Sequence, residues 1–342
     1  MPPGLKDVAA RAGVSIKTVS NVVNGHVHVA PSTRARVQEA IEALGYVPNP
    51  AARQLRGGRS GVIALAVPEL PAPYFAELAG LVVQAAERRS WTVLIEQTGG
   101  RADRERRLLA GLRRHAIDGL IFSPLALAGE EVAGAATAGG GPPMVLIGAR
   151  AGCGVADHVT IDDTAAGAEA TRHLCELGRR RIAVIGVQDG PYAAARLRLA
   201  GYRAALAEAG CATGPGLEAR VDGRGRAAGA AAMARLIERR DRPDAVFCLN
   251  DLLALGALRT LLERGIDVPG EVAVIGFDDI EDGRFATPTL STVAPDTPRV
   301  AQLAVDLLAE RLGEGAAATG PPREIRVDHR LVARESTLGR AL

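Results

Sequence analysis

Polar and charged side chains stand directly after several apolar runs of this sequence. Three such pairs follow VTI, AVFCL and VAVIGF, and they are Asp162 with Asp163, Asn250 with Asp251, and Asp278 with Asp279. A further group, Arg198, lies near the start of ARLRLAGYRAAL. Its guanidinium can hold two ligand hydroxyls or one carboxylate through a forked pair of hydrogen bonds. Together these side chains indicate a site for a small polar molecule, although acids at strand ends also cap helices and about half of them could be structural.

Two adjacent aromatic residues, Tyr74 and Phe75, follow another apolar run in the stretch PELPAPYF. The chain has only one Trp, four Tyr and five Phe, so an adjacent pair between a strand and a helix stands out. Aromatic faces suit sugars and nucleobases. We expect one ring to pack as core and Tyr74 to face the ligand. Among the other candidates, we expect Asn250 to be the better ligand contact and Asp251 to cap a helix.

The first stretch of the chain has the pattern of a helix-turn-helix. Residues Leu5 to Ala12 have helical spacing, Gly13 can end that helix in the left-handed conformation, and Ser15 can cap the next helix, Ile16 to Val23. In this motif the second helix enters the DNA major groove, and its first residues meet base edges. Here those residues are Ile16 and Lys17, with Asn21 one turn later. A third helix should start at Pro31, with a core-facing stripe of Val37, Ile41 and Leu44.

The charge of the chain is unevenly distributed. The total is +2, but residues 1–60 carry eight basic side chains against three acidic ones, so the remainder is net negative. Both lysines, Lys6 and Lys17, lie in this first part. A basic small domain beside an acidic large one suggests a polyanionic partner at the N-terminus.

Residues 5–55 resemble the DNA-binding headpiece of the LacI/GalR-type, or lactose-repressor, family of bacterial transcription regulators. The resemblance is carried without a gap by DVAARAGVSIKTVSNVVNG, by Thr33-Arg34, by GYVPNPAA and by Leu55. Gly4 and Ala30 depart from it, because the family usually has a hydroxyl side chain at both positions. The resemblance implies contacts to double-stranded DNA from Ser15, Ile16, Lys17, Thr18, Ser20, Asn21, Asn24, His28, Thr33, Asn49, Ala52 and Leu55.

The stretch NPAARQL reads as a hinge helix of roughly six residues, too short to be stable alone in water. We expect it to fold on DNA. The resemblance implies that the paired hinge helices of a dimer lie in the minor groove, where Leu55 is wedged into a base step. The alternative is a plain linker, and Arg53 and Arg56 beside Leu55 argue against it.

From Gly61 onwards, apolar strand runs alternate with helical stretches, which predicts parallel sheets covered on both faces. Strands are predicted at 62–67, 91–95, 119–122, 144–147, 158–161, 182–187, 245–249 and 272–277, with two more in EIRVDHRLVARES. Helices are predicted at 74–89, 103–115, 164–177, 193–209, 227–239, 251–264 and 297–312. These strands suffice for two sheets.

The alternating pattern resembles the periplasmic-binding-protein-like core of the same family. The predicted fold class is therefore an all-α helix-turn-helix headpiece plus an α/β core of two parallel-sheet subdomains. The expected domains are a DNA-binding domain at 1–48, a hinge at 49–60, and an effector-binding and dimerisation core at 61–342. Such cores bind ligands at the carboxyl ends of strands, between the two halves. The resemblance implies effector contacts from Tyr74, Phe75, Asp162, Arg198, Asn250 and Asp278.

Enzyme, cofactor and metal motifs are weak or missing. There is no P-loop, since no Lys follows Lys17, and no GxSxG. The stretch from Gly223 to Ala228 fits a loose dinucleotide pattern but reads as a flexible loop. The histidines show no metal spacing, and the four cysteines are far apart, which suits a reduced cytosolic protein with buried thiols. We expect no catalytic residues, cofactor or metal, although spacing alone leaves a paired-carboxylate glycosidase open.

The start MPPGLKD has no signal-peptide pattern, and no stretch of about 18 apolar residues could span a membrane. We therefore expect a cytoplasmic, homodimeric repressor that binds an approximately palindromic operator under the control of a small molecule, most simply a sugar. One alternative is a sugar-binding protein without a regulatory role, and another is a regulator that also activates.

Overall fold

The structure is a computed structural model, and it describes residues 3–23, 29–46, 59–111, 117–137, 141–149, 154–190, 192–313 and 320–339. The chain forms two compact units, Met1–Ser60 and Gly61–Leu342. Among the described residues, no helix is both long and apolar enough to cross a membrane.

The first unit contains α1 (Leu5–Ala12), α2 (Ile16–Val23) and α3 (Pro31–Leu44). Gly13 has φ 61°, which ends α1 in the left-handed conformation. Ser15 caps α2 as predicted, because its Oγ accepts a hydrogen bond from the Thr18 amide at 3.1 Å. The core of the unit is formed by Val8, Ala9, Ala12, Val19, Val22, Val37, Ala40 and Tyr46, with the predicted Ile41 and Leu44 packed against it.

Arg36 has a structural role in this unit. Its guanidinium donates to the carbonyl oxygens of Ala12 and Gly13 at 3.0 and 3.4 Å. These contacts tie α3 to the turn between α1 and α2 and hold the helix-turn-helix angle. One of the basic residues counted in the sequence is therefore engaged with backbone carbonyls.

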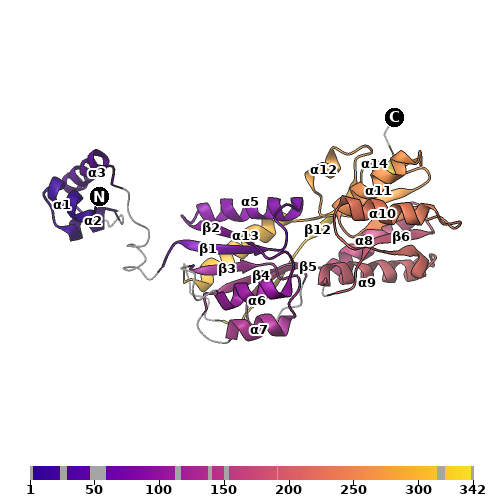
Figure 1. Ribbon diagram of the computed structural model, residues 1–342, viewed down its shortest axis with the longest axis horizontal. Coiled ribbons are helices and arrows are strands. Elements are labelled where there is room, and N and C mark those ends of the chain that lie inside the picture. The colour runs from indigo at the N-terminus through magenta and orange to yellow at the C-terminus, as the bar shows by residue number, and fades with distance from the viewer. Residues whose placement is uncertain are drawn as a thin grey trace. The chain divides into compact units, whose positions relative to one another are not determined.

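The second unit contains two six-stranded sheets, and Figure 1 shows each of them between layers of helices. The first sheet has the order β11-β5-β4-β3-β1-β2, and all its strand pairs are parallel. Its strands are β1 (Val62–Val67), β2 (Thr92–Gln97), β3 (Gly119–Phe122), β4 (Met144–Ile147), β5 (Asp157–Ile161) and β11 (Glu324–Val327). Helices α5 (Pro73–Glu87) and α13 (Thr297–Arg311) pack on one face, and α6 (Ala102–Gly111) and α7 (Gly129–Thr137) pack on the other.

The second sheet has the order β12-β10-β9-β8-β6-β7 and is parallel except for the pair β10 and β12. Its strands are β6 (Ile182–Val187), β7 (Glu218–Arg220), β8 (Ala245–Cys248), β9 (Ala273–Phe277), β10 (Ser291–Pro295) and β12 (His329–Val332). One face packs against α8 (Asp163–Glu176) and α9 (Ala193–Glu208), and the other against α10 (Arg226–Ile237) and α11 (Asp251–Glu263). The predicted fold class is confirmed.

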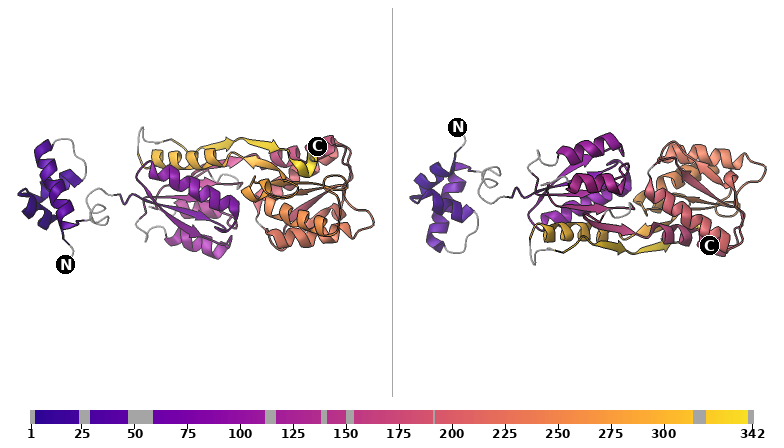
Figure 2. Two further views of the ribbon diagram at one scale, coloured as in Figure 1. Left: turned by 90° about the horizontal axis from the view of Figure 1, so that it is seen from above. Right: turned by 90° about the horizontal axis from the view of Figure 1, so that it is seen from below.

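The chain passes between the two sheets three times, at Asp162, Asp296 and Asp328. Figure 2 shows the C-terminal segment running from the first half of the core to the second. The sequence missed several short elements: α7, β7, β10, the turn-like helices η1 (Pro215–Leu217), α12 (Glu281–Arg284) and α14 (Glu335–Leu338). All but α7 have only three to five residues, which carry too little periodicity to be recognised from sequence. The nine residues of α7, GEEVAGAAT, are mostly small or charged and show no apolar stripe.

Candidate functional site

The first candidate site is the start of α2 in the first unit. Ser15, Ile16 and Lys17 are exposed there, and Ile16 retains 38% of its surface although it is a large apolar residue. Thr18, whose hydroxyl lies 2.8 Å from Ser15 Oγ, is half-buried. Ser20, Asn21 and Thr33 are half-buried as well. The other predicted DNA contacts, Asn24, His28, Asn49, Ala52 and Leu55, lie outside the described residues.

The second candidate site is a cavity of about 370 Å³ between the two halves of the core. It opens at the carboxyl ends of strands from both sheets, which is where open α/β folds bind ligands. Tyr74, Phe75 and Ser123 line it from the first half, and Arg198, Asn250 and Asp278 line it from the second. Five of the six residues predicted for the effector therefore line one cavity.

Arg198 is held rigidly in this cavity. Its Nε donates to Asp163 Oδ1 at 2.7 Å, and its Nη1 donates to the carbonyl of Leu249 at 2.7 Å. Asp278 Oδ1 lies 3.8 Å from Nη1, and the guanidinium carbon lies 3.3 Å from the centre of the Phe277 ring. Because the side chain is clamped from several sides, its orientation is set before any ligand arrives.

Close helix packing sets the distance between Asp163 and Arg198. Asp163 begins α8 and Arg198 lies in the first half of α9, and the two helices touch at Gly201. A Cβ built on Gly201 would lie 2.0 Å from the Thr164 carbonyl oxygen. Only glycine lets the backbones approach this closely, and the approach brings the acid and the guanidinium into contact.

Asp278 is presented by a strained turn. Asp278 and Asp279 have φ values of 114° and 55°, in the region that L-residues seldom occupy. Burial raises the pKa of the Asp278 carboxyl to about 7, and Asp163 adds to the rise while Arg198 opposes it. Backbone strain of this kind persists only where the surrounding structure enforces it.

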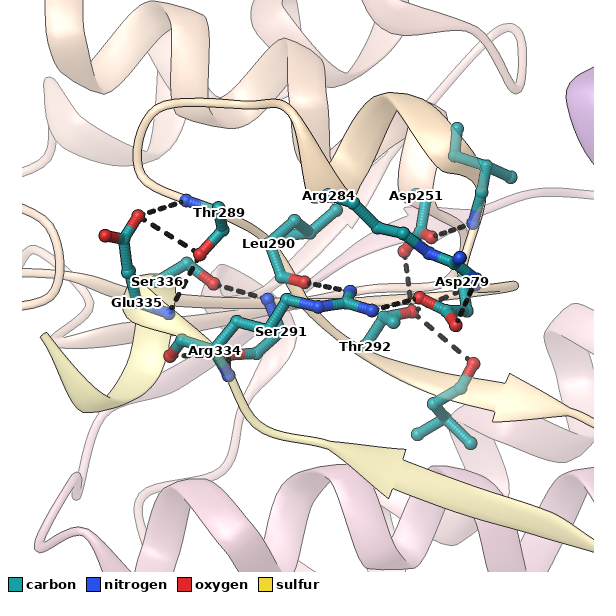
Figure 3. A network of polar contacts seen from close by, with 12 residues as sticks. Asp251, Asp279, Arg284, Thr289, Leu290, Ser291, Thr292, Arg334, Glu335 and Ser336 are labelled. Atoms are coloured by element: carbon teal, nitrogen blue, oxygen red, sulfur yellow. Dashed lines mark hydrogen bonds and ion pairs between the residues drawn. The ribbon is translucent and has the colours of Figure 1, made fainter. Parts of the chain in front are cut away.

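A polar network enforces the turn (Figure 3). The buried Asp251 accepts from the Ile280 amide at 3.0 Å and from the Thr292 hydroxyl at 2.8 Å. Asp279 accepts from Arg334 at 2.5 Å and from Arg284 at 2.9 Å. The two residues after Asp278 are therefore anchored, and Asp278 itself faces the cavity.

The prediction that Asp251 caps a helix is wrong, while the prediction that Asn250 contacts the ligand stays a prediction. Asn250 is the N-cap of α11, since its Oδ1 accepts from the Leu253 amide at 2.8 Å, and its Nδ2 donates to the Arg224 carbonyl at 3.1 Å. Asn250 also lines the cavity, so the same residue caps the helix and borders the cavity. Asp251 does not cap the helix but supports the turn at Asp278 through its bond to the Ile280 amide. Burial and the nearby Asp278 raise the pKa of Asp251.

Asp162, predicted from the resemblance to line the cleft, is not among the residues lining the cavity. It caps α8 by accepting from the Ala165 amide at 2.9 Å, and its other oxygen lies 3.6 Å from Arg326 Nη1. The next residue, Asp163, lines the cavity instead and is only 2% exposed. The free amides at the start of α8 draw the first acid of the pair away from the ligand side.

Both aromatic residues of the predicted pair line the cavity and also touch the core of the first half. Their rings meet edge to face, with centroids 5.1 Å apart and planes at 72°. Burial and the nearby Asp278 raise the pKa of Tyr74, so its phenol remains a proton donor. We expected one ring to pack in the core and the other to face the ligand. Instead, each ring both packs against the core and lines the cavity.

Sequence reasoning missed three cavity residues that form a group at one side. Arg224 pairs with Glu69 at 3.1 Å, which joins the two halves of the core, and its guanidinium lies 6.0 Å from the centre of the Tyr192 ring. Tyr192 had a signal, because it follows a proline between a strand and a helix, as Tyr74 does. Arg224 lies in the glycine-rich stretch for which the sequence predicts a flexible loop, and no local pattern marks it.

Metal chemistry has no support in the part of the chain that the structure describes, where no three His, Cys, Asp or Glu side chains are grouped to hold an ion. The cavity combines carboxylates, a guanidinium, an amide and aromatic faces, which suits reversible recognition of a polar molecule. The exposed start of α2 suits contact with base edges.

Comparison with known proteins finds matches to both units of the chain. Residues 4–49 match the family model of bacterial regulatory proteins of the lacI family, and residues 171–337 match that of a periplasmic binding protein-like domain. The transcriptional regulator CelR of Thermobifida fusca is 38% identical over 98% of this chain and 98% of its own length.

Two solved structures extend the comparison. A complex of the regulator CelR with cellobiose shares 33% identity over 98% of this chain and 99% of that one, with a TM-score of 0.71. The lac repressor dimer bound to operator and an anti-inducer shares 27% identity over 99% of this chain and 100% of that one, with a TM-score of 0.87. Since the likeness runs through the helix-turn-helix and the cavity-bearing core alike, the chain belongs to the LacI family of bacterial transcriptional regulators, which are DNA-binding proteins and not enzymes.

Proposed function

We propose that this regulator is a sequence-specific repressor whose affinity for its operator is controlled by a sugar bound in the core cavity. The observation that carries the proposal is the convergence of Arg198, Asp163 and Asp278 with two aromatic rings in one cavity. Neighbouring carboxylate and guanidinium groups can bond several hydroxyls, and ring faces cover the apolar side of a sugar. The effector contacts are Tyr74, Phe75, Arg198, Asn250 and Asp278, with Asp163 in place of Asp162.

DNA recognition is assigned to the first unit. Ile16, Lys17 and Asn21 read bases, while Ser15, Thr18, Ser20, Asn24, His28 and Thr33 support or contact the backbone. Lys17 can donate to guanine acceptors, and Asn21 can bond a base edge. The hinge at 49–60, with Asn49, Ala52 and Leu55, joins the domain at 1–48 to the core at 61–342. Because its target is chromosomal DNA, the protein is placed in the cytoplasm.

The protein acts as a homodimer on an approximately palindromic operator, because two headpieces on one two-fold axis require mirrored half-sites. The lac repressor structure is of a dimer on its operator. Exposed apolar residues in this chain support the same arrangement: Phe285 keeps 80% of its surface exposed beside α12, and Leu94 keeps 46% on the edge strand β2. We place Phe285, the most exposed large apolar side chain among the described residues, in the interface with the partner.

Selection of operators from random duplex DNA tests the repressor proposal. The binding constant for the selected site should fall steeply with salt concentration, because each neutralised phosphate releases counterions. A constant that is flat between low and physiological salt would defeat DNA binding as the function. A selected operator upstream of a reporter should lower its expression, and a consistent increase would show an activator instead.

Substitution of Lys17 tests base reading. Lys17→Ala should change which operator is preferred, by about 1–3 kcal/mol at a single base pair. The other lysine, Lys6, is exposed on α1, and Lys6→Ala is the matched control. Loss of affinity that is equal for all operators would show that Lys17 contacts phosphate only.

A thermal-shift screen of monosaccharides, disaccharides and purines tests the effector class, since a ligand that binds only the folded chain raises Tm. Each hit is then added to an operator titration. A purine hit with no sugar hit would contradict the proposed class while leaving the regulator intact.

A further inference from the structure

Two of the cysteines that lie far apart in the sequence meet in the second half of the core. Cys175 Sγ lies 3.5 Å from Cys211 Sγ, although the two residues are 36 positions apart. Both side chains belong to the cluster between α8, α9 and the second sheet. A disulfide needs about 2.05 Å between the sulfurs, so a small movement of each side chain would suffice.

The two thiols stand at the ends of the helix pair that holds the effector residues. Cys175 is in the last turn of α8, and Cys211 follows the end of α9. The same helices present Asp163 and Arg198 to the cavity near their N-terminal ends, and they are locked together at Gly201. A bond between the sulfurs would tie this pair at its far end as well.

The surroundings distinguish the two sulfurs. Cys211 is 9% exposed and follows Ala209 and Gly210, which are both exposed. The guanidinium of Arg180 lies beside this sulfur, with Nη1 4.0 Å from Cys211 Sγ. Burial and the contact with Cys211 raise the pKa of Cys175 to about 12, so Cys175 keeps its proton until a partner sulfur is activated. Cys211 is therefore the sulfur that reacts first.

We propose that Cys175 and Cys211 form an oxidation site, a dithiol that hydrogen peroxide converts into a disulfide linking α8 to the end of α9. The Cys211 thiolate attacks one peroxide oxygen, the O–O bond breaks, and the departing hydroxide takes up a proton to become water. The resulting sulfenic acid is attacked by the Cys175 sulfur, which gives up its proton as the S–O bond breaks and a second water leaves. In sum, two thiols and one peroxide give one disulfide and two waters, and a dithiol reductant reverses the change.

The test uses the full-length chain with Cys153→Ser, because Cys153 lies outside the described residues. The reduced protein is treated with excess hydrogen peroxide, quenched, alkylated in denaturant and digested for mass spectrometry. We expect two of the three thiols to be lost to alkylation, a peptide pair linked through Cys175 and Cys211, and full reversal by dithiothreitol.

Three variants give the controls. Cys248 is a buried cysteine on β8, and Cys248→Ser should form the linked peptides as the parent does. Cys211→Ser should not react at Cys175, and Cys175→Ala should stop at sulfenic or sulfinic acid on Cys211. The proposal is overturned if the folded parent keeps both thiols, if Cys211 is over-oxidised without a link, or if the link forms only in denaturant.

Thermal unfolding provides a second reading that does not depend on DNA or effector. The crosslink restricts the unfolded chain, so Tm of the oxidised parent should exceed that of the reduced parent by about 5 °C. Cys175→Ala should show no such difference between peroxide-treated and untreated samples. An unchanged or lower Tm in a fully linked parent would show that the disulfide strains the helix pair. That result would overturn the proposed oxidation site at Cys175 and Cys211.

Discussion

At the scale of single residues, Asp278 combines a strained backbone with a largely buried, ionisable side chain. Its backbone is strained, it faces the cavity, and burial raises the pKa of its carboxyl to about 7. Because this pKa is higher in the folded chain than in the unfolded chain, ionisation of Asp278 lowers the free energy of unfolding as pH rises from about 4 to above 7. Asp278 therefore does not add to stability at neutral pH, and we propose that it serves the ligand.

We therefore expect Asp278→Asn to stabilise the chain at pH 8 by up to a few kcal/mol, since one pKa unit corresponds to about 1.4 kcal/mol. The gain should shrink towards pH 5, where the wild-type carboxyl is protonated. The same variant should lose most effector affinity, because an amide accepts fewer hydroxyl hydrogen bonds than a carboxylate. Tm measured against pH checks the first part and calorimetric titration of a sugar hit checks the second.

The matched control for this substitution is Asp282→Asn. Asp282 is an exposed acid on the neighbouring α12, where it pairs with Arg226. Its replacement should leave the pH profile of Tm close to that of the wild type. A profile for Asp278→Asn that is parallel to the wild-type profile would show that Asp278 does not titrate between pH 4 and 8.

At the scale of elements, the contact between α8 and α9 determines how well the cavity is ordered. A Cβ on Gly201 would lie 2.0 Å from the Thr164 carbonyl oxygen, so Gly201→Ala must push the helices apart. Overpacking of this kind typically costs about 1–3 kcal/mol, and it should also lengthen the contact between Asp163 and Arg198. We expect a lower Tm together with weaker effector binding.

Gly80→Ala is the control for the helix contact. Gly80 is exposed on α5, and no atom lies within 4 Å of a Cβ built on it. Alanine is the better helix former by about 1 kcal/mol, so this variant should match or exceed the wild type in Tm and bind effector normally. If Gly201→Ala behaved in the same way, the close packing would not be what positions the two side chains.

At the scale of the whole molecule, the proposed dimer formation can be tested without disturbing the fold of each chain. Because Phe285 is 80% exposed, Phe285→Glu should leave Tm of the dissociated chain nearly unchanged. A charge in the interface should weaken self-association by at least tenfold, and operator affinity should fall with it. Analytical ultracentrifugation measures the first effect and operator titration the second.

The control variant Leu177→Glu places the same charge on an exposed leucine at the end of α8. It should leave association unchanged. A Phe285→Glu protein that still sediments as a dimer would exclude this surface from the interface.

The coupling between cavity and operator is expected to pass through the hinge, and Leu55 lies outside the described residues. A hinge of about six residues is marginal as a helix, so a small effect of the effector can decide whether it folds on DNA. Coupling of about 1–3 kcal/mol is expected, and it must be reciprocal between DNA and effector.

Leu55→Gly should lower operator affinity and shrink its response to effector, while effector binding to the free protein stays nearly unchanged. Operator titrations with and without effector measure both quantities. If Leu55→Gly kept wild-type operator affinity and a full response to effector, the hinge would only connect the domains and would not transmit the signal.

Local patterns were sufficient for the described helices of the headpiece and for most of the longer strands and helices of the core. Ser15, Gly13 and the stripe at Val37 act on neighbours within one or two turns, so periodicity and capping rules describe them. Continuous apolar strands likewise predict parallel sheets without knowledge of their partners. The carboxyl ends of those strands then indicate where Tyr74, Arg198 and Asp278 should gather.

Tertiary structure decided which member of each polar pair lines the cavity. Asp162 caps α8 and Asp163 lines the cavity, whereas Asn250 caps α11 and also lines the cavity. These positions depend on packing between residues distant in sequence, such as Thr164 against Gly201. The meeting of Arg224 with Glu69, and of Cys175 with Cys211, has the same origin. No local pattern records such contacts, because they exist only once the two sheets and their helices have packed.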